Sequence, residues 1–311
     1  MRNIFSILGL LALVALLSVV PNQTVQGQAA QPAGGPQAGQ GQRPQMVPIG
    51  HSDQPFNAKD FTGVWNSSNE GKPPGMLNTL SLDRPPMTPE GQAKLKTVKT
   101  GYNGRELGNG VVQDMKQWND PIMWCDPPGW PRVLWHPETP GMKFVMTPAE
   151  VIQFFENTHT WRDMWTDGRK LADDPEPRWY GYSVGRWDGN VFTVDSSGFD
   201  SRSWVDQYGS PHSDQMKMQE HYERIDHDRL ALTMTLTDPK IYTKPWNSYK
   251  MILKLADKST RTPGDNWSKK ADGTPYGDIR EEICLYSESQ SFFTNIDPEG
   301  TGGLKPPPER R

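Results

Sequence analysis

The loop at residues 204–214 brings a histidine and two carboxylates close together in the chain. Asp206 precedes a turn that contains Gly and Pro, and His212 and Asp214 follow that turn. Imidazole titrates near neutral pH, so His212 oriented by Asp206 or Asp214 could act as a general acid–base pair. The alternative is that His212 only hydrogen-bonds the backbone of its own loop.

A second group of polar side chains lies on a strand predicted over residues 218–224. Successive side chains of a strand point to opposite faces, so Glu220, Tyr222 and Arg224 share one face. The strand predicted next, over 230–237, carries a row of apolar side chains. If that row faces an enclosed interior, the polar row beside it could hold a ligand there. The alternative is a solvated face.

Residues 159–166 supply a third group, again on a predicted strand. One face of this strand carries an imidazole, a carboxylate and two indoles, from His159, Trp161, Asp163 and Trp165. Two indoles beside an imidazole are typical of an aromatic pocket wall with one polar point, although the same pattern fits a core face. Arg162 or Arg224 could hold an anionic group of a ligand.

Motifs for several common chemistries are absent from the sequence. None of the six histidines stands in a spacing such as His-x-Glu-x-x-His, so no metal site is predicted. The sequence has no phosphate-binding glycine loop, no Gly-x-Ser-x-Gly elbow and no dinucleotide fingerprint, so no cofactor is predicted. The formal charge of −4, without a basic stripe, argues against nucleic acid as a partner.

The elements that hold these side chains are predicted to be mostly strands. Alternating patterns and turn signals such as Asp-Gly-Asn at 188–190 predict strands over residues 60–66, 151–156, 159–166, 180–187, 191–196, 218–224, 230–237, 246–255 and 281–287. Thr-Pro-Glu at 88–90 predicts the start of a short helix. Successive hairpins without helices between them favour a mainly β fold, a single antiparallel up-and-down β-barrel with long loops and one or two short helices.

The two ends of the chain differ in composition from its middle. Residues 1–27 combine a basic start, an apolar run and a cleavable end, which predicts a signal peptide. Residues 28–55 predict a disordered tether, 56–293 the barrel domain and 294–311 a flexible tail. We therefore expect a secreted or periplasmic protein with no integral membrane segment after cleavage, the alternative being a retained anchor.

The chain has two cysteines, Cys125 and Cys284, far apart in the sequence. In an oxidising compartment an even pair favours a disulfide between them. The alternative is two unpaired buried thiols.

Several short motifs carry a resemblance to known proteins. They include Asn119-Asp120-Pro121, Gly185-Arg186-Trp187-Asp188-Gly189, Gly209-x-Pro211-His212-Ser213 and Asp238-Pro239-x-x-Tyr242-x-x-Pro245-Trp246. In these segments the chain resembles a large family of uncharacterised secreted bacterial proteins, a resemblance that implies no assigned chemistry. Gly63-x-Trp65 at the first strand resembles the start of lipocalin and calycin-like barrels, which implies a cup for a small, usually apolar, ligand.

Three functions are compatible with these features. The first is a secreted lipocalin-like protein that binds a small aromatic or amphipathic ligand in a barrel cavity lined by aromatic residues. The second is a secreted hydrolase, lyase or isomerase that uses the His/Asp pair on the same barrel. The third is an interaction protein of the cell envelope.

Overall fold

A computed structural model describes residues 45–74, 78–101, 112, 117–135, 141–256, 278–279 and 283–285. The predicted signal peptide (1–27), the first part of the predicted tether and the predicted tail (294–311) lie outside the described residues. So does most of the strand predicted over 281–287. Among the described residues, no helix has the length and apolar character needed to cross a membrane.

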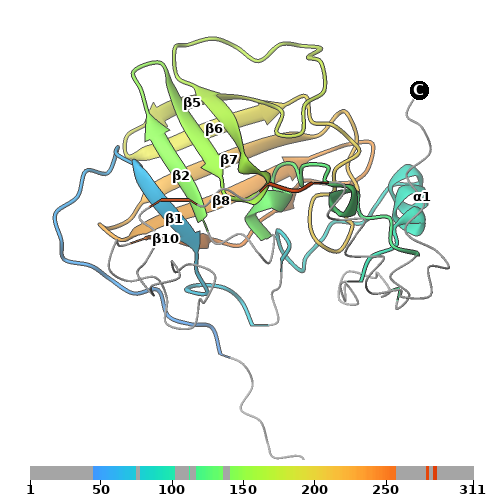
Figure 1. Cartoon of the computed structure of the whole chain (residues 1–311), viewed down its shortest axis with the longest axis horizontal. Coiled ribbons are helices and arrows are strands. Elements are labelled where there is room, and N and C mark those ends of the chain that lie inside the picture. Colours follow the sequence, from blue (N-terminus) through green and yellow to red (C-terminus); the bar gives the residue numbers. More distant parts are fainter. Residues whose placement is uncertain are drawn as a thin grey trace, which may run out of the picture. The chain divides into compact units, whose positions relative to one another are not determined.

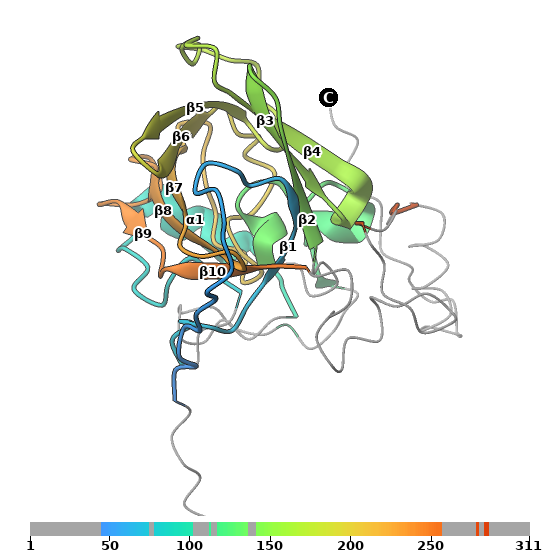
Figure 2. The same ribbon diagram turned by 90° about the vertical axis from the view of Figure 1, so that its left-hand side faces the viewer.

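Nine strands close into a barrel in which each strand pairs with the next along the chain (Figure 1). These strands are β1 (Gly63–Ser67), β2 (Gly141–Met146), β3 (Glu150–Phe155), β4 (Thr160–Trp165), β5 (Tyr182–Asp188), β6 (Val191–Ser197), β7 (Lys217–Arg224), β8 (Arg229–Thr237) and β10 (Met251–Leu255). β10 pairs with both β1 and β8 and closes the ring of strands seen in Figure 2. The short β9 (Trp246–Asn247) also pairs with β8, so the strand predicted over 246–255 is two short strands.

The prediction of a mainly β barrel is confirmed, but the sheet is not wholly antiparallel. β4 and β5 run parallel and share only two residue pairs, Met164 with Ser183 and Trp165 with Val184. Residues 166–181 connect the two strands outside the sheet (Figure 1). A connection this long lets the chain return to the end where β4 began, so the next strand runs in the same direction.

Aromatic rings fill one end of the barrel interior. Phe61, just before β1, lies with its ring centroid 6.0 to 6.2 Å from those of Phe144, Phe192 and Tyr222. The centroids of Phe144 and Tyr222 are 5.9 Å apart, and all four side chains are fully buried. Since these rings contact one another, they form a packed core at this end of the barrel rather than the walls of a hollow.

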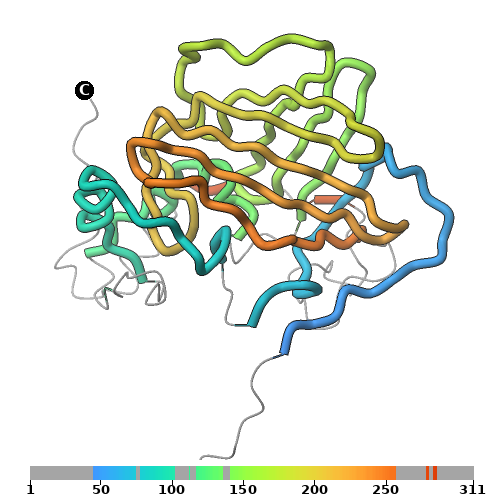
Figure 3. The backbone as a smooth tube through the Cα atoms, turned by 180° about the vertical axis from the view of Figure 1, so that it is seen from behind, coloured from blue at the N-terminus to red at the C-terminus, as the bar shows by residue number. Residues whose placement is uncertain are grey.

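The predicted short helix is present as α1 (Pro89–Thr97), which lies at one end of the barrel (Figures 1 and 3). The Thr88 hydroxyl accepts a hydrogen bond from the Gly91 N–H at 3.1 Å and caps the helix. A Cβ at Gly91 would lie 2.5 Å from the carbonyl oxygen of Ile241. Glycine therefore lets the helix approach the turn that follows β8.

Three 3-10 helices complete the described elements, namely η3 (Pro121–Trp124), η4 (Arg132–Trp135) and η5 (Asn157–His159). All four residues of η4 are buried. Arg132 donates through Nη1 to the Asp120 carboxylate at 2.8 Å, inside this buried layer. Trp130 packs on Phe155 of β3, with ring centroids 6.0 Å apart. The described part of the long irregular segment before β2, residues 117–135, therefore covers the barrel core.

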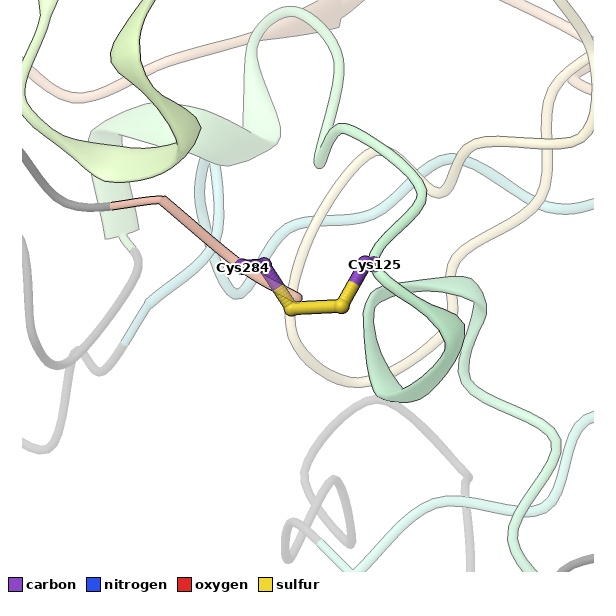
Figure 4. Close-up of a disulfide and its surroundings, with 2 residues drawn as sticks. All are labelled: Cys125 and Cys284. Atoms are coloured by element: carbon purple, nitrogen blue, oxygen red, sulfur yellow. A yellow bond between two sulfur atoms is a disulfide. The ribbon is translucent and has the colours of Figure 1, made fainter. Parts of the chain in front are cut away.

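The predicted disulfide between Cys125 and Cys284 is confirmed (Figure 4). The two residues are 159 positions apart in the sequence. The bond joins the loop after η3 to the described residues 283–285 of the C-terminal segment.

Residues 45–55, which the sequence assigns to the tether, run along the outside of the barrel in the structure and form an N-terminal strap (Figure 3). The Gly50 N–H donates to the Glu70 carboxylate at 2.9 Å, and Glu70 also accepts from Arg229 Nε at 2.6 Å. The Ser52 N–H donates to Asp226 at 3.2 Å. Backbone donors and buried charges thus hold a segment that has little apolar surface to bury.

We expect Cys125→Ser combined with Cys284→Ser to lower the free energy of unfolding by about 2–4 kcal/mol, because the bond restricts a long loop of the unfolded chain. Urea unfolding monitored by tryptophan fluorescence measures this change. A reducing agent should destabilise the wild type to the same extent and leave the double variant unaffected. Equal stability of wild type and variant would contradict a structural role for the bond.

Acid should weaken the attachment of the strap. Burial alone would raise the pKa of Glu70, but Arg229, the Gly50 N–H and Lys254 outweigh it and lower the pKa from 4.5 to about 2. The stabilisation from this carboxylate is therefore complete above pH 4.5 and is lost as the pH falls towards 2.

We expect Glu70→Gln to cost about 2 kcal/mol of unfolding free energy at pH 7 and to flatten the loss of stability between pH 5 and pH 2. Urea titrations at several pH values test this expectation. Glu223→Gln, which removes an exposed carboxylate of β7, is the matched control. If the stability of E70Q changed with pH in parallel with that of the wild type, protonation of Glu70 would not be the cause of the acid destabilisation.

Candidate functional site

A cleft of about 460 Å³ opens in the barrel wall between β4 and the segment that leads into β5. β4 and β5 pair only at Met164 and Trp165 of β4, so among the described residues the first half of β4 has no backbone partner on this side. The cleft occupies this gap. Its lining comprises Pro127, Thr160, Trp161, Arg162, Asp163, Trp165, Pro177, Arg178, Trp179, Tyr180, Gly181, Tyr182, Ser183, Asp200 and Arg202.

Aromatic side chains from both sides line this cleft. On β4, Trp161 and Trp165 alternate with inward-facing residues, and Trp161 is 57% exposed. On the other side lie Trp179 and Tyr182. Large indole surfaces that stay in contact with water offer stacking area to a planar ligand.

Arginines stack on three of these aromatic rings. The Arg169 guanidinium lies 3.6 Å from the centroid of Trp165, Arg178 lies 4.3 Å from Tyr182, and Arg202 lies 4.5 Å from Trp179. Cation–π contacts of this kind orient the rings and keep the charges at the rim of the cleft.

Arg162 forms the floor of the cleft and at the same time enters the barrel interior. Its Nη1 and Nη2 donate to the two Glu220 oxygens at 2.8 and 2.6 Å, and its Nε donates to Gln153 at 2.8 Å. Nη2 also donates to the Tyr222 hydroxyl at 2.9 Å, and that hydroxyl donates to Glu220 at 2.8 Å. The guanidinium lies 3.5 Å from the ring centroid of Trp130. These contacts use four of the five N–H donors of Arg162.

The protonation states of this buried network follow from its contacts. Burial alone would lower the pKa of Arg162, but the charge of Glu220 and the hydrogen bonds to Glu220 and Tyr222 outweigh it and raise the pKa. Burial and the Glu220 carboxylate raise the pKa of the Tyr222 hydroxyl well above 10. Arg162 therefore stays charged and Tyr222 stays protonated throughout the physiological pH range.

The structure separates the predicted ligand-binding residues into four places. Trp161, Arg162 and Trp165 line the cleft, and Glu220 and Tyr222 lie one layer behind it in the interior. His159 is exposed in η5 and does not line the cleft. Arg224 lies elsewhere, where its guanidinium donates to the carbonyl oxygens of Asp60 and His227.

Sequence reasoning missed the half of the cleft that comes from the β4–β5 connection and from residues 200–202. Arg178, Trp179, Asp200 and Arg202 lie in irregular segments, where no periodicity shows which way a side chain points. The sequence signal that could have indicated this half of the cleft is the cluster of Trp and Tyr at 179–182, shortly after Pro177.

The predicted His/Asp pair is not brought together. His212 is buried, with Nε2 2.9 Å from the Ser203 hydroxyl and Nδ1 3.1 Å from the Ser213 carbonyl oxygen. Asp206 accepts hydrogen bonds from the Tyr208 and Ser210 N–H groups and from two hydroxyls of its surroundings. Asp214 is exposed and pairs with Lys240 at 2.8 Å. Neither carboxylate is a hydrogen-bond partner of His212 in the described part of the chain.

The contact between Ser203 and His212 has the residue types of an activated nucleophile. However, Ser203 is 2% and His212 1% exposed, and the Ser203 hydroxyl also lies 3.1 Å from the Asp200 carbonyl oxygen. A Cβ at Gly129 would lie 2.8 Å from that hydroxyl, so the backbone of the covering loop leaves no room for a substrate. Burial lowers the pKa of His212 and keeps it neutral, which suits a hydrogen-bonded role in the packing of this loop.

No protein family, curated protein or solved structure matches this chain in the three comparisons made. The resemblance to secreted bacterial proteins and to lipocalins therefore stays a prediction. Among the described residues, no group of three or more His, Cys, Asp or Glu side chains is arranged to hold a metal ion.

Replacing Arg162 alone should be strongly destabilising. Arg162→Met leaves the Glu220 carboxylate buried without its cation, which costs about 3–5 kcal/mol of unfolding free energy. Arg162→Met combined with Glu220→Met removes both charges, so it should restore at least half of that loss. Thermal and urea unfolding of the wild type and the two variants measure these differences in unfolding free energy. A double variant less stable than the single one would contradict this account of the network.

Proposed function

We propose that this protein binds a small amphipathic molecule outside the cytoplasm, in the lateral cleft between β4 and β5. The observation that carries this proposal is an open cleft of about 460 Å³ with Trp161, Trp165, Trp179 and Tyr182 in its lining. This volume falls within the range of about 300–1,000 Å³ typical of small-molecule sites. A flat ligand face would cover the indole surface that Trp161 now exposes to water.

The location of the proposed site differs from the cup that a lipocalin-like barrel implies. Phe61, Phe144, Phe192 and Tyr222 pack against one another in the interior, so a ligand there would have to displace core side chains. The lateral cleft needs no such displacement. Its floor, Arg162, is fixed by Glu220, so the site is formed before a ligand arrives.

Two features support a place outside the cytoplasm. The Cys125–Cys284 disulfide is stable in oxidising compartments, and residues 1–27 have the composition of a signal peptide. We therefore propose that the mature protein acts in the periplasm or after secretion.

The rival role as a hydrolase, lyase or isomerase has less support. It requires His212 to meet a substrate together with a carboxylate, whereas His212 is buried away from the cleft lining and has no carboxylate partner among the described residues.

Saturation-transfer NMR with a panel of soluble sugars and aromatic acids tests the binding proposal. We expect at least one compound class to receive saturation from the protein, and Trp161→Ala to weaken its binding roughly three- to tenfold through loss of stacking. Phe56→Ala, which removes an exposed aromatic ring outside the cleft, should leave binding unchanged.

Native mass spectrometry of the protein purified from its own source is an independent test of the same proposal. A bound small molecule that W161A no longer retains would support the cleft. If no compound in the panel binds and the native protein carries no ligand, the proposed function is wrong.

A further inference from the structure

The cleft contains one arginine that makes no ion pair and donates no side-chain hydrogen bond among the described residues. Arg202 is paired with Asp200, which accepts from its Nε at 2.8 and 2.9 Å. Arg162 is paired with Glu220. Arg178 has no described side-chain hydrogen bond or ion pair, and its guanidinium only stacks on Tyr182 at 4.3 Å. It is exposed and lines the cleft, so its donors are available to a ligand.

Asp163 has the complementary property in the same cleft. The described residues offer its carboxylate neither a hydrogen-bond donor nor an ion-pair partner within contact distance, although it is only partly exposed. Partial burial raises the pKa of Asp163, and the charge of Arg178 works against that rise. Both side chains line the same cleft, and no direct bond between them is described.

A ligand that satisfies this lining needs three properties. It needs an anionic group for the free guanidinium of Arg178, because charge-assisted hydrogen bonds to arginine are the strongest available there. It needs a hydrogen-bond donor for Asp163, because a partly desolvated carboxylate without a donor is costly. It also needs a flat apolar face for Trp161, which both aromatic rings and pyranose rings possess.

Resting on the proposed function, we propose that the cleft binds a sugar acid, with its carboxylate on Arg178, a hydroxyl on Asp163 and its ring face on Trp161. An unsubstituted aromatic acid such as benzoate has a carboxylate for Arg178 but brings no donor to Asp163. A neutral sugar has hydroxyls for Asp163 but leaves the guanidinium unmatched. A sugar acid supplies both groups on one ring, and its remaining hydroxyls can bond Thr160 at the edge of the floor.

Isothermal titration calorimetry with three probes tests the ligand class. The probes are trigalacturonate, the neutral trisaccharide maltotriose, and benzoate. We expect trigalacturonate to bind roughly tenfold or more tightly than either of the others, because it alone can use Arg178, Asp163 and Trp161 together.

Two variants assign the contributions to residues. Arg178→Gln should remove the preference for trigalacturonate over maltotriose, and Asp163→Asn should remove the preference for trigalacturonate over benzoate. Arg186→Gln is the matched control, because Arg186 is an exposed arginine on β5 that pairs with Asp195 and does not line the cleft. Circular dichroism melting curves should show that all three variants remain folded.

The outcomes separate this inference from the proposed function. Equal binding of trigalacturonate and maltotriose, or equal binding of trigalacturonate and benzoate, would overturn the sugar-acid assignment. The sugar-acid assignment would also be wrong if trigalacturonate failed to bind while other compounds of the NMR panel bound in a manner that depends on Trp161. In that case the proposed function would still stand. If nothing binds in either experiment, both fail.

Discussion

The ion pair between Arg162 and Glu220 is the interaction on which the rest of the structure depends. Removing two charges from water is expensive, and the arrangement is tolerable because the two charges pair bidentately and further hydrogen bonds satisfy most of the remaining groups. Gln153 of β3, Tyr222 of β7 and the ring of Trp130 surround the pair. Strands on both sides of the barrel and the covering loop therefore have to adopt one relative position, which an apolar contact of the same size would not specify so closely.

The same arginine connects the interior of the barrel with its surface. β4 and β5 pair at only two positions, and Arg162 lies in the part of β4 that has no β5 partner. Its side chain is buried in the core, and the residue also belongs to the lining of the cleft. The buried Arg162 network holds β4 in place behind the cleft, so the barrel provides rigidity while the irregular connection provides most of the recognition surface.

The features of the fold and of the cleft that could be predicted from the sequence are those that residues close together in the chain determine. Alternation in 218–224 predicted one face for Glu220, Tyr222 and Arg224, and all three are buried on one side of β7. The Asp-Gly-Asn turn at 188–190 predicted a hairpin, and β5 pairs with β6 there, with Gly189 at φ 59°. Alternation carries no information on strand direction, so the parallel β4–β5 pair was not predictable. The partners of His212, and the cleft residues outside the strands, depend on tertiary contacts that a single sequence does not show.

The position of Cys284 has a consequence for the order of events during biosynthesis. Cys125 directly follows η3, two residues before Pro127 in the lining of the cleft, whereas its bonding partner is synthesised 159 residues later. A chain that emerges from its N-terminus can pair its strands one after another, but it cannot close this bond until the C-terminal segment has followed. The segment beside Pro127 is therefore secured only after Cys284 has been synthesised, and a chain that ends before Cys284 would carry the barrel strands without that covalent bond.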